Sequence, residues 1–330
     1  MAQDVQYIEV DTSAEQADEA YAESSASSAL TSLASEIKRG IQENGRTYAS
    51  YGSHEYGLPV DERELDRQDL QHHKFVLAQG DKLFLTPLTE IVQNVLDIGT
   101  GTGIWCIDMA DRFPSAHITG TDIAPVQPTW VPPNCNFIIE DCETNWQFQK
   151  DSLDFIHSRD CYTSVRDWPR FMKQTSDHLN PGGWAELACS TPTVHSDDDS
   201  LPADSAIVEF SETMKKIGNA FDADLETPHR YAEWMKEAGF VNVTERKIKI
   251  PLSEWPKDKN LKKVGVLERL NLIEGAESFM LRGFTENLQR PRDEMELLLM
   301  RMRKELMANK YHGYIFFVVA YGQKPRTVGS

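Results

Sequence analysis

The sequence predicts a doubly wound α/β fold, in which helices cover both faces of a mainly parallel sheet. Short apolar runs alternate with helical patterns through the centre of the 330-residue chain, and this alternation is typical of successive βαβ units. A glycine-rich turn, Gly99–Gly103, directly follows the first of these apolar runs and precedes a helical pattern. The apolar fraction of 40% is enough for a sizeable core. We therefore expect a folded domain with a binding site at the glycine turn.

Seven segments are short and apolar enough to be strands, so we expect a seven-stranded sheet. Helical periodicity fills most of the remaining chain beyond the glycine turn. The predicted strands are 95–98, 117–121, 136–139, 153–157, 184–188, 241–250 and 314–320. The predicted helices are 104–113, 168–179, 205–218, 228–238, 261–274 and 292–309.

Composition divides the chain into three parts. Residues 1–35 are rich in Asp, Glu, Ser and Ala and contain no Lys or Arg, which predicts a disordered acidic tail. Residues 36–90 are expected to form an N-terminal helical or lid segment. Residues 91–330 then form the main domain. Its helical insertions, at about 195–240 and 252–310, are natural places for substrate selection.

Two helices are expected in the N-terminal part. Apolar residues recur at helical spacing over residues 29–44, which predicts a short helix there. The strongly charged stretch 61–77 has a narrow apolar stripe and predicts an amphipathic helix. The adjacent His72 and His73 would point in different directions on that helix, and no third ligand is evident. We therefore expect no metal site.

Charge and composition exclude several classes of function. A formal net charge of −18 opposes contact with the phosphate backbone, so we expect no direct binding of nucleic acid. No stretch approaches the roughly 20 apolar residues that a membrane span requires, and residues 1–11 lack the pattern of a secretory signal. The five cysteines are widely spaced and include no Cys-x-x-Cys pair, so neither a disulfide framework nor a zinc site is indicated.

The spacing of the glycine turn favours S-adenosylmethionine over a dinucleotide as cofactor. Gly99, Gly101 and Gly103 follow Asp97 in the pattern Asp-x-Gly-x-Gly-x-Gly, whereas dinucleotide sites use Gly-x-Gly-x-x-Gly and would need glycine where Ile104 stands. Because no pyrophosphate has to be held, an acidic residue is acceptable at the strand end. We expect Asp97 to face the ammonium group of the methionine moiety.

Further cofactor contacts are expected at the ends of the next strands. Asp122, followed by Ile123, lies where a carboxylate can accept hydrogen bonds from both ribose hydroxyls. Asp141 and Cys142 follow the third strand, where such folds contact the adenine. The remaining predicted cofactor residues are Thr100, Ser158, Arg159 and Tyr51.

Methyl transfer from a sulfonium is an in-line displacement, in which positioning supplies most of the catalysis. A general base matters only when the acceptor must lose a proton. His157 and Asp160 are the candidates, because they follow the fourth strand at the crevice where cofactor and acceptor meet. A structural role for His157 in the core stays open.

The tyrosine-rich region 43–56 has two interpretations. Its tyrosines, among them Tyr48, Tyr51 and Tyr56, could form a lid that closes over the sulfonium, since aromatic faces attract cations. Alternatively, they could attach the N-terminal helix to the main domain.

Eight stretches together resemble a known family, the fungal LaeA-like methyltransferases, which regulate secondary metabolism and development and include velvet-associated enzymes. They are 43–48, 61–73, 95–108, 130–133, 154–159, 168–169, 181–183 and 255–258. The resemblance implies a seven-stranded class I methyltransferase fold of Rossmann-like type and S-adenosyl-L-methionine as cofactor. It also implies a location in the nucleus, the cytoplasm or both, and assembly with a velvet-type or sister methyltransferase protein.

Two functions of different classes follow. The first is an active methyltransferase that acts on a protein or a small molecule. The second is a catalytically silent subunit that binds the cofactor within a regulatory complex. An oxidoreductase is disfavoured, because Ile104 interrupts the dinucleotide pattern.

Overall fold

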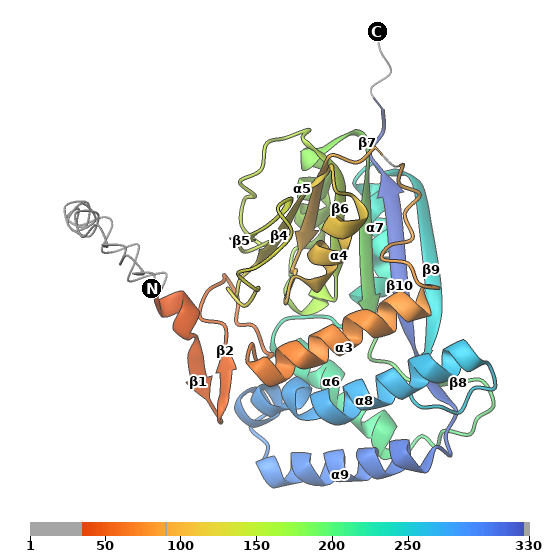
Figure 1. Cartoon of the computed structure of the whole chain (residues 1–330). Helices are drawn as coiled ribbons and strands as arrows, with labels where there is room; N and C mark the ends of the chain where they lie inside the picture. The colour runs from red at the N-terminus through yellow and green to blue at the C-terminus, as the bar shows by residue number, and fades with distance from the viewer. Residues whose placement is uncertain (1–34, 90, 327–330) are drawn as a thin grey trace, which may run out of the picture.

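The centre of the structure, a computed structural model that describes residues 35–89 and 91–326, is a mixed sheet (Figure 1). All seven predicted strands are present. They are β3 (Asn94–Ile98), β4 (His117–Asp122), β5 (Cys135–Ile139), β6 (Leu153–Arg159), β7 (Leu179–Ser190), β9 (Val241–Pro251) and β10 (Gly313–Gln323). The sheet also contains a two-residue strand that was not predicted, β8 (His195–Ser196), which pairs with β10.

Strand order places a crevice beside β3. The order is β5-β4-β3-β6-β7-β10, and β9 pairs with β10. The strands from β5 to β7 are parallel, whereas β10 runs antiparallel to β7 and β9. Because β4 follows β3 on one side and β6 lies on the other, the strand order reverses at β3, and such switch points are where open α/β sheets bind ligands.

Helices cover both faces of the sheet, as a doubly wound fold requires. On β3, Val95 packs with α4 (Ile104–Arg112), while its neighbour Leu96 packs on the opposite face with α5 (Trp168–His178) and α7 (Tyr231–Glu237). A 3₁₀ turn, Thr227–Arg230, leads into α7, and another, Cys161–Thr163, follows β6.

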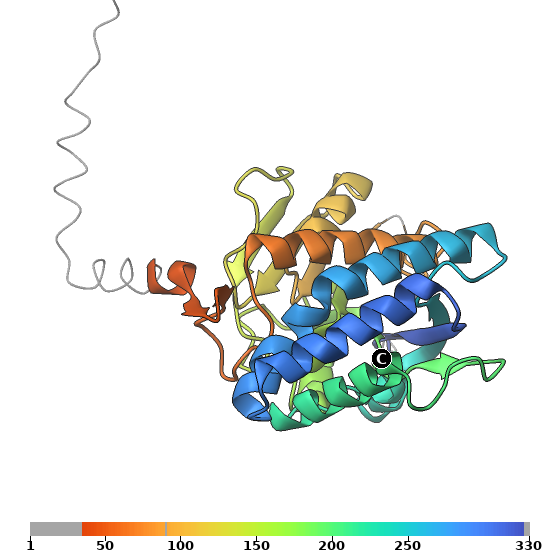
Figure 2. The same ribbon diagram turned by 90° about the horizontal axis from the view of Figure 1, so that it is seen from below.

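Four further helices form a layer next to the crevice. They are α3 (Glu62–Ala78), α6 (Ala206–Ala220), α8 (Lys259–Arg282) and α9 (Arg292–Ala308). Seen from below, they lie side by side, and α8 packs on both α3 and α9 (Figure 2). Their apolar faces share one core cluster with β9 and β10. A fold without this layer would leave the carboxyl ends of the parallel strands uncovered.

Helix α8 is longer than predicted. It was expected to end at 274, but it continues to Arg282 and then into a π-helical turn, Gly283–Asn287. Gly275 is a packing position: a Cβ there would lie 2.5 Å from Cδ of Arg67 on α3. The glycine therefore allows two helices to approach closely and does not end the helix.

The helix predicted over 29–44 is confirmed at residues 35–39 and is wrong beyond them. Residues 35–39 are helical, but a hairpin follows, formed by β1 (Ile41–Glu43) and β2 (Arg46–Tyr48). Asn44 and Gly45 both have positive φ, 52° and 75°, which is the geometry of a two-residue Asn-Gly hairpin turn. The predicted tail, apart from residue 35, lies outside the described residues.

The helix predicted over 61–77 is confirmed as α3. Asp61 caps its N-terminus by accepting a hydrogen bond from the Glu64 N–H. Among the helices of the described residues, none is long and apolar enough to cross a membrane.

Candidate functional site

The glycine turn after β3 is held in a fixed shape by the neighbouring strand. The N–H groups of Gly99 and Thr100 both donate to the carbonyl of Thr121 at the end of β4, each over 2.9 Å. Gly101 and Gly103 have φ angles of 56° and 81°, in the left-handed region that favours glycine. A Cβ on Gly103 would lie 2.3 Å from Cζ of Phe137, so this glycine permits close packing on β5.

A cavity of about 260 Å³ opens beside this turn. We call its first part the glycine-turn end; it is lined by Gly99–Thr102, by Asp122 and Ile123, by 140–142 and by 52–56 of the N-terminal segment. Its second part, the helical chamber, is lined mainly by apolar side chains of α6, α8 and α9. These are Ile207, Phe210, Met214, Leu272, Met302 and Leu306.

Asp122 organises the glycine-turn end. One carboxylate oxygen accepts the N–H of Gly101 over 2.8 Å, and the other accepts the N–H of Ala124 over 3.0 Å. Burial raises the pKa of Asp122, although these hydrogen bonds oppose the shift. Gln127 donates to the carbonyl of the same glycine over 2.7 Å. The carboxylate is thus oriented at the cavity wall, and each oxygen keeps a lone pair for a ligand hydroxyl.

Asp141 connects the N-terminal segment to the sheet. Its two carboxylate oxygens accept the N–H of Ser53 over 2.5 Å and the N–H of Glu143 over 2.9 Å. Burial of Asp141 favours the neutral form, but these hydrogen bonds prevail and lower its pKa. This contact places residues 52–56 over the end of β5.

Helix α3 lies against the glycine turn. The hydroxyl of Thr102 donates to Asp69 over 2.7 Å, and a Cβ on Gly101 would lie 2.6 Å from the side-chain oxygen of Gln68. Both glutamines of this helix, Gln68 and Gln71, line the cavity. The charged helix of the sequence is therefore one wall of the site.

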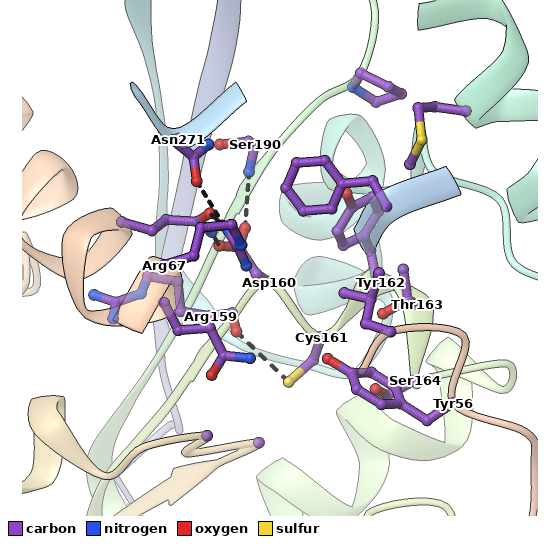
Figure 3. Close-up of a pocket in the computed structure, with 18 of the residues that line it drawn as sticks. Tyr56, Arg67, Arg159, Asp160, Cys161, Tyr162, Thr163, Ser164, Ser190 and Asn271 are labelled. Carbon is purple, nitrogen blue, oxygen red and sulfur yellow. Dashed lines mark hydrogen bonds between the residues drawn. The ribbon is translucent and has the colours of Figure 1, made fainter. Parts of the chain in front are cut away.

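A polar network separates the two parts of the cavity. Asp160 accepts the backbone N–H of Ser190 over 3.1 Å and a hydrogen bond from Gln71. Arg67 donates to Asn271 of α8 over 2.6 Å and also to Gln71 (Figure 3). Tyr56, Tyr162 and Ser164 lie on the opposite side of the cavity in the same view (Figure 3).

Comparison with known proteins agrees with this arrangement. A family model described as "Methyltransferase domain" matches residues 70–245, a little over half of the chain. The chain belongs to this methyltransferase domain family. Together with the strand order, the match confirms the predicted class I methyltransferase fold.

Three relatives show which methyltransferases this chain is similar to. Methyltransferase pytC of Aspergillus terreus is 41% identical over 303 residues, which cover 90% of this chain and 92% of pytC. The secondary metabolism regulator LAE1 of Cochliobolus heterostrophus is 33% identical, with 82% and 91% covered. The secondary metabolism regulator laeA of Aspergillus flavus is 32% identical, with 90% and 80% covered. The predicted resemblance to the LaeA-like family is confirmed.

The methyltransferase cavity contains most of the predicted site residues. Nine of them line it, which is what a cofactor or acceptor contact requires. They are Gly99, Thr100, Gly101, Asp122, Ile123, Asp141, Cys142, Arg159 and Asp160. Three other predicted cofactor residues, Gly103, Ser158 and Tyr51, do not line it. Gly103 packs on Phe137, Ser158 is buried in β6, and Tyr51 is exposed to solvent.

Asp97 and His157 are paired inside the sheet and do not line the cavity. Their side chains lie 2.7 Å apart, and the His157 ring stacks on Trp105 of α4 with 4.0 Å between the ring centroids. Asp97 is also 3.6 Å from the Cys106 thiol. Asp97 was predicted to face the ammonium group of the methionine moiety, but its side chain points into the sheet and not into the cavity. The structural role left open for His157 is the one observed, because the ring is enclosed on the α4 face.

Arg159 and Asp160 reach the cavity but are engaged by the protein. The guanidinium of Arg159 contacts His72 over 3.1 Å and lies 5.4 Å from the centre of the Phe75 ring. Burial lowers the pKa of Arg159. Asp160 adopts a φ of 57°, unusual for a residue other than glycine, and its carboxylate is held by Ser190 and Gln71. These contacts favour a positioning role for Asp160 over that of a free base.

Sequence reasoning missed several lining residues. Residues 52–55 and the α3 glutamines line the cavity, and so do residues of α6, α8 and α9. Tyr56 also lines the cavity, and the sequence had named it in one of the two interpretations of the tyrosine-rich region 43–56. For α3 no such signal exists, because a charged helix in a linker resembles any solvated helix.

Thiol and metal chemistry have no support in this cavity. Burial raises the pKa of Cys161 to about 12 and that of Cys142 well above its usual value, so neither is a ready nucleophile. Within residues 35–89 and 91–326, no cluster of three or more His, Cys, Asp or Glu could hold a metal ion.

Proposed function

We propose that this chain is an active S-adenosylmethionine-dependent methyltransferase that binds its cofactor at the glycine-turn end and its acceptor in the helical chamber. The observation that carries the proposal is the Asp122 carboxylate, oriented by Gly101 and Ala124 at the cavity wall beside a left-handed glycine turn. The shape of this wall fits a nucleoside ligand, because both carboxylate oxygens can accept hydroxyls of one ribose.

When bound, S-adenosylmethionine would supply an electrophilic methyl group: the acceptor lone pair would form the new bond to carbon, and the electrons of the broken carbon–sulfur bond would stay on the sulfur of S-adenosylhomocysteine. Any proton that the methylated acceptor carries would pass to bulk water after its release. The chain's own contribution is positioning. Asp122 and the turn amides orient the nucleoside, and Tyr56 and residues 52–55 cover it and exclude water. The network of Arg67, Gln71 and Asp160 fixes the junction between the two ligands.

A catalytically silent subunit is the second candidate. It is favoured by one observation, that neither predicted base is available: His157 is paired with Asp97, and Asp160 is held by Ser190 and Gln71. Methyl transfer to a neutral lone pair, such as that of an amine nitrogen, does not require the acceptor to lose a proton first and so needs no protein base, and we therefore favour the active enzyme. The relatives named secondary metabolism regulators support a role in secondary metabolism or development. A nuclear or cytoplasmic location and a velvet-type or sister methyltransferase partner stay part of the proposal.

Calorimetry of the purified full chain tests the cofactor. We expect one equivalent of S-adenosylhomocysteine to bind and NAD⁺ not to bind. Gly101→Val should abolish binding, because valine is strained at a φ of 56° and its Cβ would lie 2.6 Å from Gln68. Gly80→Val is the matched control, since Gly80 has a φ of 72° with nothing within 4 Å, outside the cavity. Binding of NAD⁺ in place of S-adenosylhomocysteine would contradict the proposal.

A further inference from the structure

The helical chamber has a wall that is chemically unlike the glycine-turn end. Ile207, Phe210, Met302 and Leu306 are buried in the main core cluster, with Met302 only 1% and Leu306 only 2% exposed. Met214 and Leu272 are partly buried and pack against the same cluster. The chamber is therefore an interior surface of the protein, formed where α6, α8 and α9 leave their apolar side chains facing the cavity.

The charged side chains that α3 and α8 contribute to the chamber are already paired, whereas Arg159, at the end of β6, lines the cavity with its Nη1 buried and without a hydrogen-bond partner among the described residues. Lys74 of α3 is paired with Glu268 of α8, and both side chains are almost completely buried. Arg67 is paired with Glu64 over 2.6 Å and also bonded to Asn271. Neither pair leaves a charge free to balance that of a charged acceptor. Burying an uncompensated charge among apolar side chains is costly.

Asp160, at the junction, is the remaining carboxylate that an ammonium or guanidinium group could approach from the chamber. Its two oxygens already accept hydrogen bonds from Ser190 and Gln71. A lysine or arginine side chain of a protein acceptor would therefore lack a free carboxylate here. The peptide backbone on either side of that lysine or arginine would also be buried against apolar side chains, without hydrogen-bond partners.

We propose that the acceptor is an uncharged small molecule with a mainly hydrocarbon body that enters the helical chamber whole, and not a side chain of a protein. This inference rests on the proposed function and extends it to the class of substrate. Apolar walls with a few polar groups at one end are typical of sites that enclose small molecules. The polar end, formed by Asn271, Ser190 and Gln71, would orient the one heteroatom that receives the methyl group.

Fluorescence titration with N-phenyl-1-naphthylamine, an uncharged aromatic probe, tests the inference on the full chain saturated with S-adenosylhomocysteine. We expect saturable binding of one probe per chain with a blue-shifted emission. Met214→Trp should weaken this binding at least tenfold, because the larger ring fills the chamber. Met300→Trp is the matched control, because Met300 lies on α9 but is 58% exposed and outside the cavity. It should bind the probe like the wild type.

A second variant and a second probe keep the test decisive. Met214→Gln has nearly the length of methionine but a polar end, so it should also weaken probe binding if Met214→Trp does not fold. 8-Anilinonaphthalene-1-sulfonate has the same aromatic body with a negative charge, and we expect it to bind at least tenfold more weakly than the neutral probe. Tighter binding of the sulfonate would overturn the assignment of an uncharged acceptor.

The two proposals can fail separately. If S-adenosylhomocysteine does not bind by calorimetry, the proposed function fails. If it binds but the neutral probe does not, or binds equally to wild type and both Met214 variants, only the inference about the acceptor fails. Binding of a fluorescein-labelled lysine-rich dodecapeptide that Met214→Trp abolishes would also overturn it, in favour of a protein acceptor.

Discussion

Single carboxylates hold the loops around the cavity by accepting backbone N–H groups. Asp122 fixes the glycine turn, Asp141 fixes Ser53, and Asp160 fixes Ser190, the last residue of β7. Hydrogen bonds from backbone amides to ionised carboxylates are among the stronger ones in proteins. The walls are therefore preorganised before a ligand arrives, which lowers the ordering cost of binding.

Asp122→Ala should weaken S-adenosylhomocysteine binding by roughly tenfold or more. Each charge-assisted hydrogen bond to a ribose hydroxyl contributes about 1.5 to 3 kcal/mol, and the change also frees Gly101 from its anchor. Calorimetry measures the effect. Asp111→Ala, at an exposed position of α4, is the control and should bind normally. An unchanged affinity in Asp122→Ala would remove this carboxylate from the site.

His72 should make stability depend on pH below neutrality. Burial lowers its pKa and the nearby Arg159 adds to the shift, although Asp108, 2.9 Å away, opposes it. The unfolded chain, with a histidine pKa of about 6.5, then binds more protons than the folded chain. His72 therefore contributes stability above about pH 6.5 that is lost as the pH falls through the window below that value.

Urea unfolding between pH 7 and pH 5 measures this contribution. We expect His72→Gln to lose less stability over this range than the wild type. His117→Gln, an exposed change at the start of β4, should leave the wild-type slope unaltered. Equal slopes for wild type and His72→Gln would show that His72 titrates alike in the folded and unfolded chains.

Among single residues, the sequence predicted those that directly follow a strand. Asp122 and Asp141 were found because the carboxyl ends of parallel strands meet at one edge. Asp97 and His157 were proposed on the same ground, but neither lines the cavity. Strand position alone does not say on which face a side chain lies, and both point toward Trp105 and α4, away from the cavity.

Different residues of the N-terminal segment attach it to the main domain and line the cavity. Arg46 donates to Asp61 over 2.7 Å and to Ser278 of α8 over 2.9 Å, and Arg282 lies 4.5 Å from the centre of the Tyr48 ring. These contacts attach the hairpin to α3 and α8. Tyr56 instead lines the cavity. Attachment and ligand contact can therefore be separated by mutation.

Tyr56→Ala should weaken S-adenosylmethionine binding about two- to thirtyfold, the range that corresponds to a cation–π contribution of about 0.5 to 2 kcal/mol. Tyr51→Ala, at an exposed tyrosine outside the cavity, should have no effect. Arg46→Met should instead lower the melting temperature, because it leaves Asp61 unpaired, and should change affinity little. Calorimetry and thermal unfolding on all three variants provide the check. If Tyr56→Ala lowered the melting temperature without changing the affinity, the segment would be attached through Tyr56.

Elements were predicted well where burial dictates the pattern. All seven strands and the capped helix α3 followed from apolar runs and charge periodicity. The β1–β2 hairpin was missed because strands of three residues are too short to show alternation, so the helical spacing at Leu33 and Ile37 was extended to Asn44. The length of α8 was missed because only the contact with Arg67 shows that Gly275 is a packing residue.

The charge of the whole molecule limits its partners. With 34 Lys and Arg against 52 Asp and Glu, the net charge of −18 repels polyanions at long range. We expect no retardation of a 30-base-pair duplex DNA in an electrophoretic mobility assay at about 50 mM salt, where electrostatic attraction would be strongest. A retarded band that disappears at about 200 mM salt would contradict this and would point to a basic surface that the total charge conceals.

Strand β10 has a consequence for how the protein is made. It lies between β7 and β9 and also pairs with β8, yet residues 313–323 leave the ribosome after every other strand of the sheet. Until then, β7 presents an unpaired edge, and β9 has no partner in the sheet. Nascent chains stalled before residue 313 should therefore depend on chaperones and be prone to pair with one another through that edge. Synthesis of the last strand both closes the sheet and ends this vulnerable period.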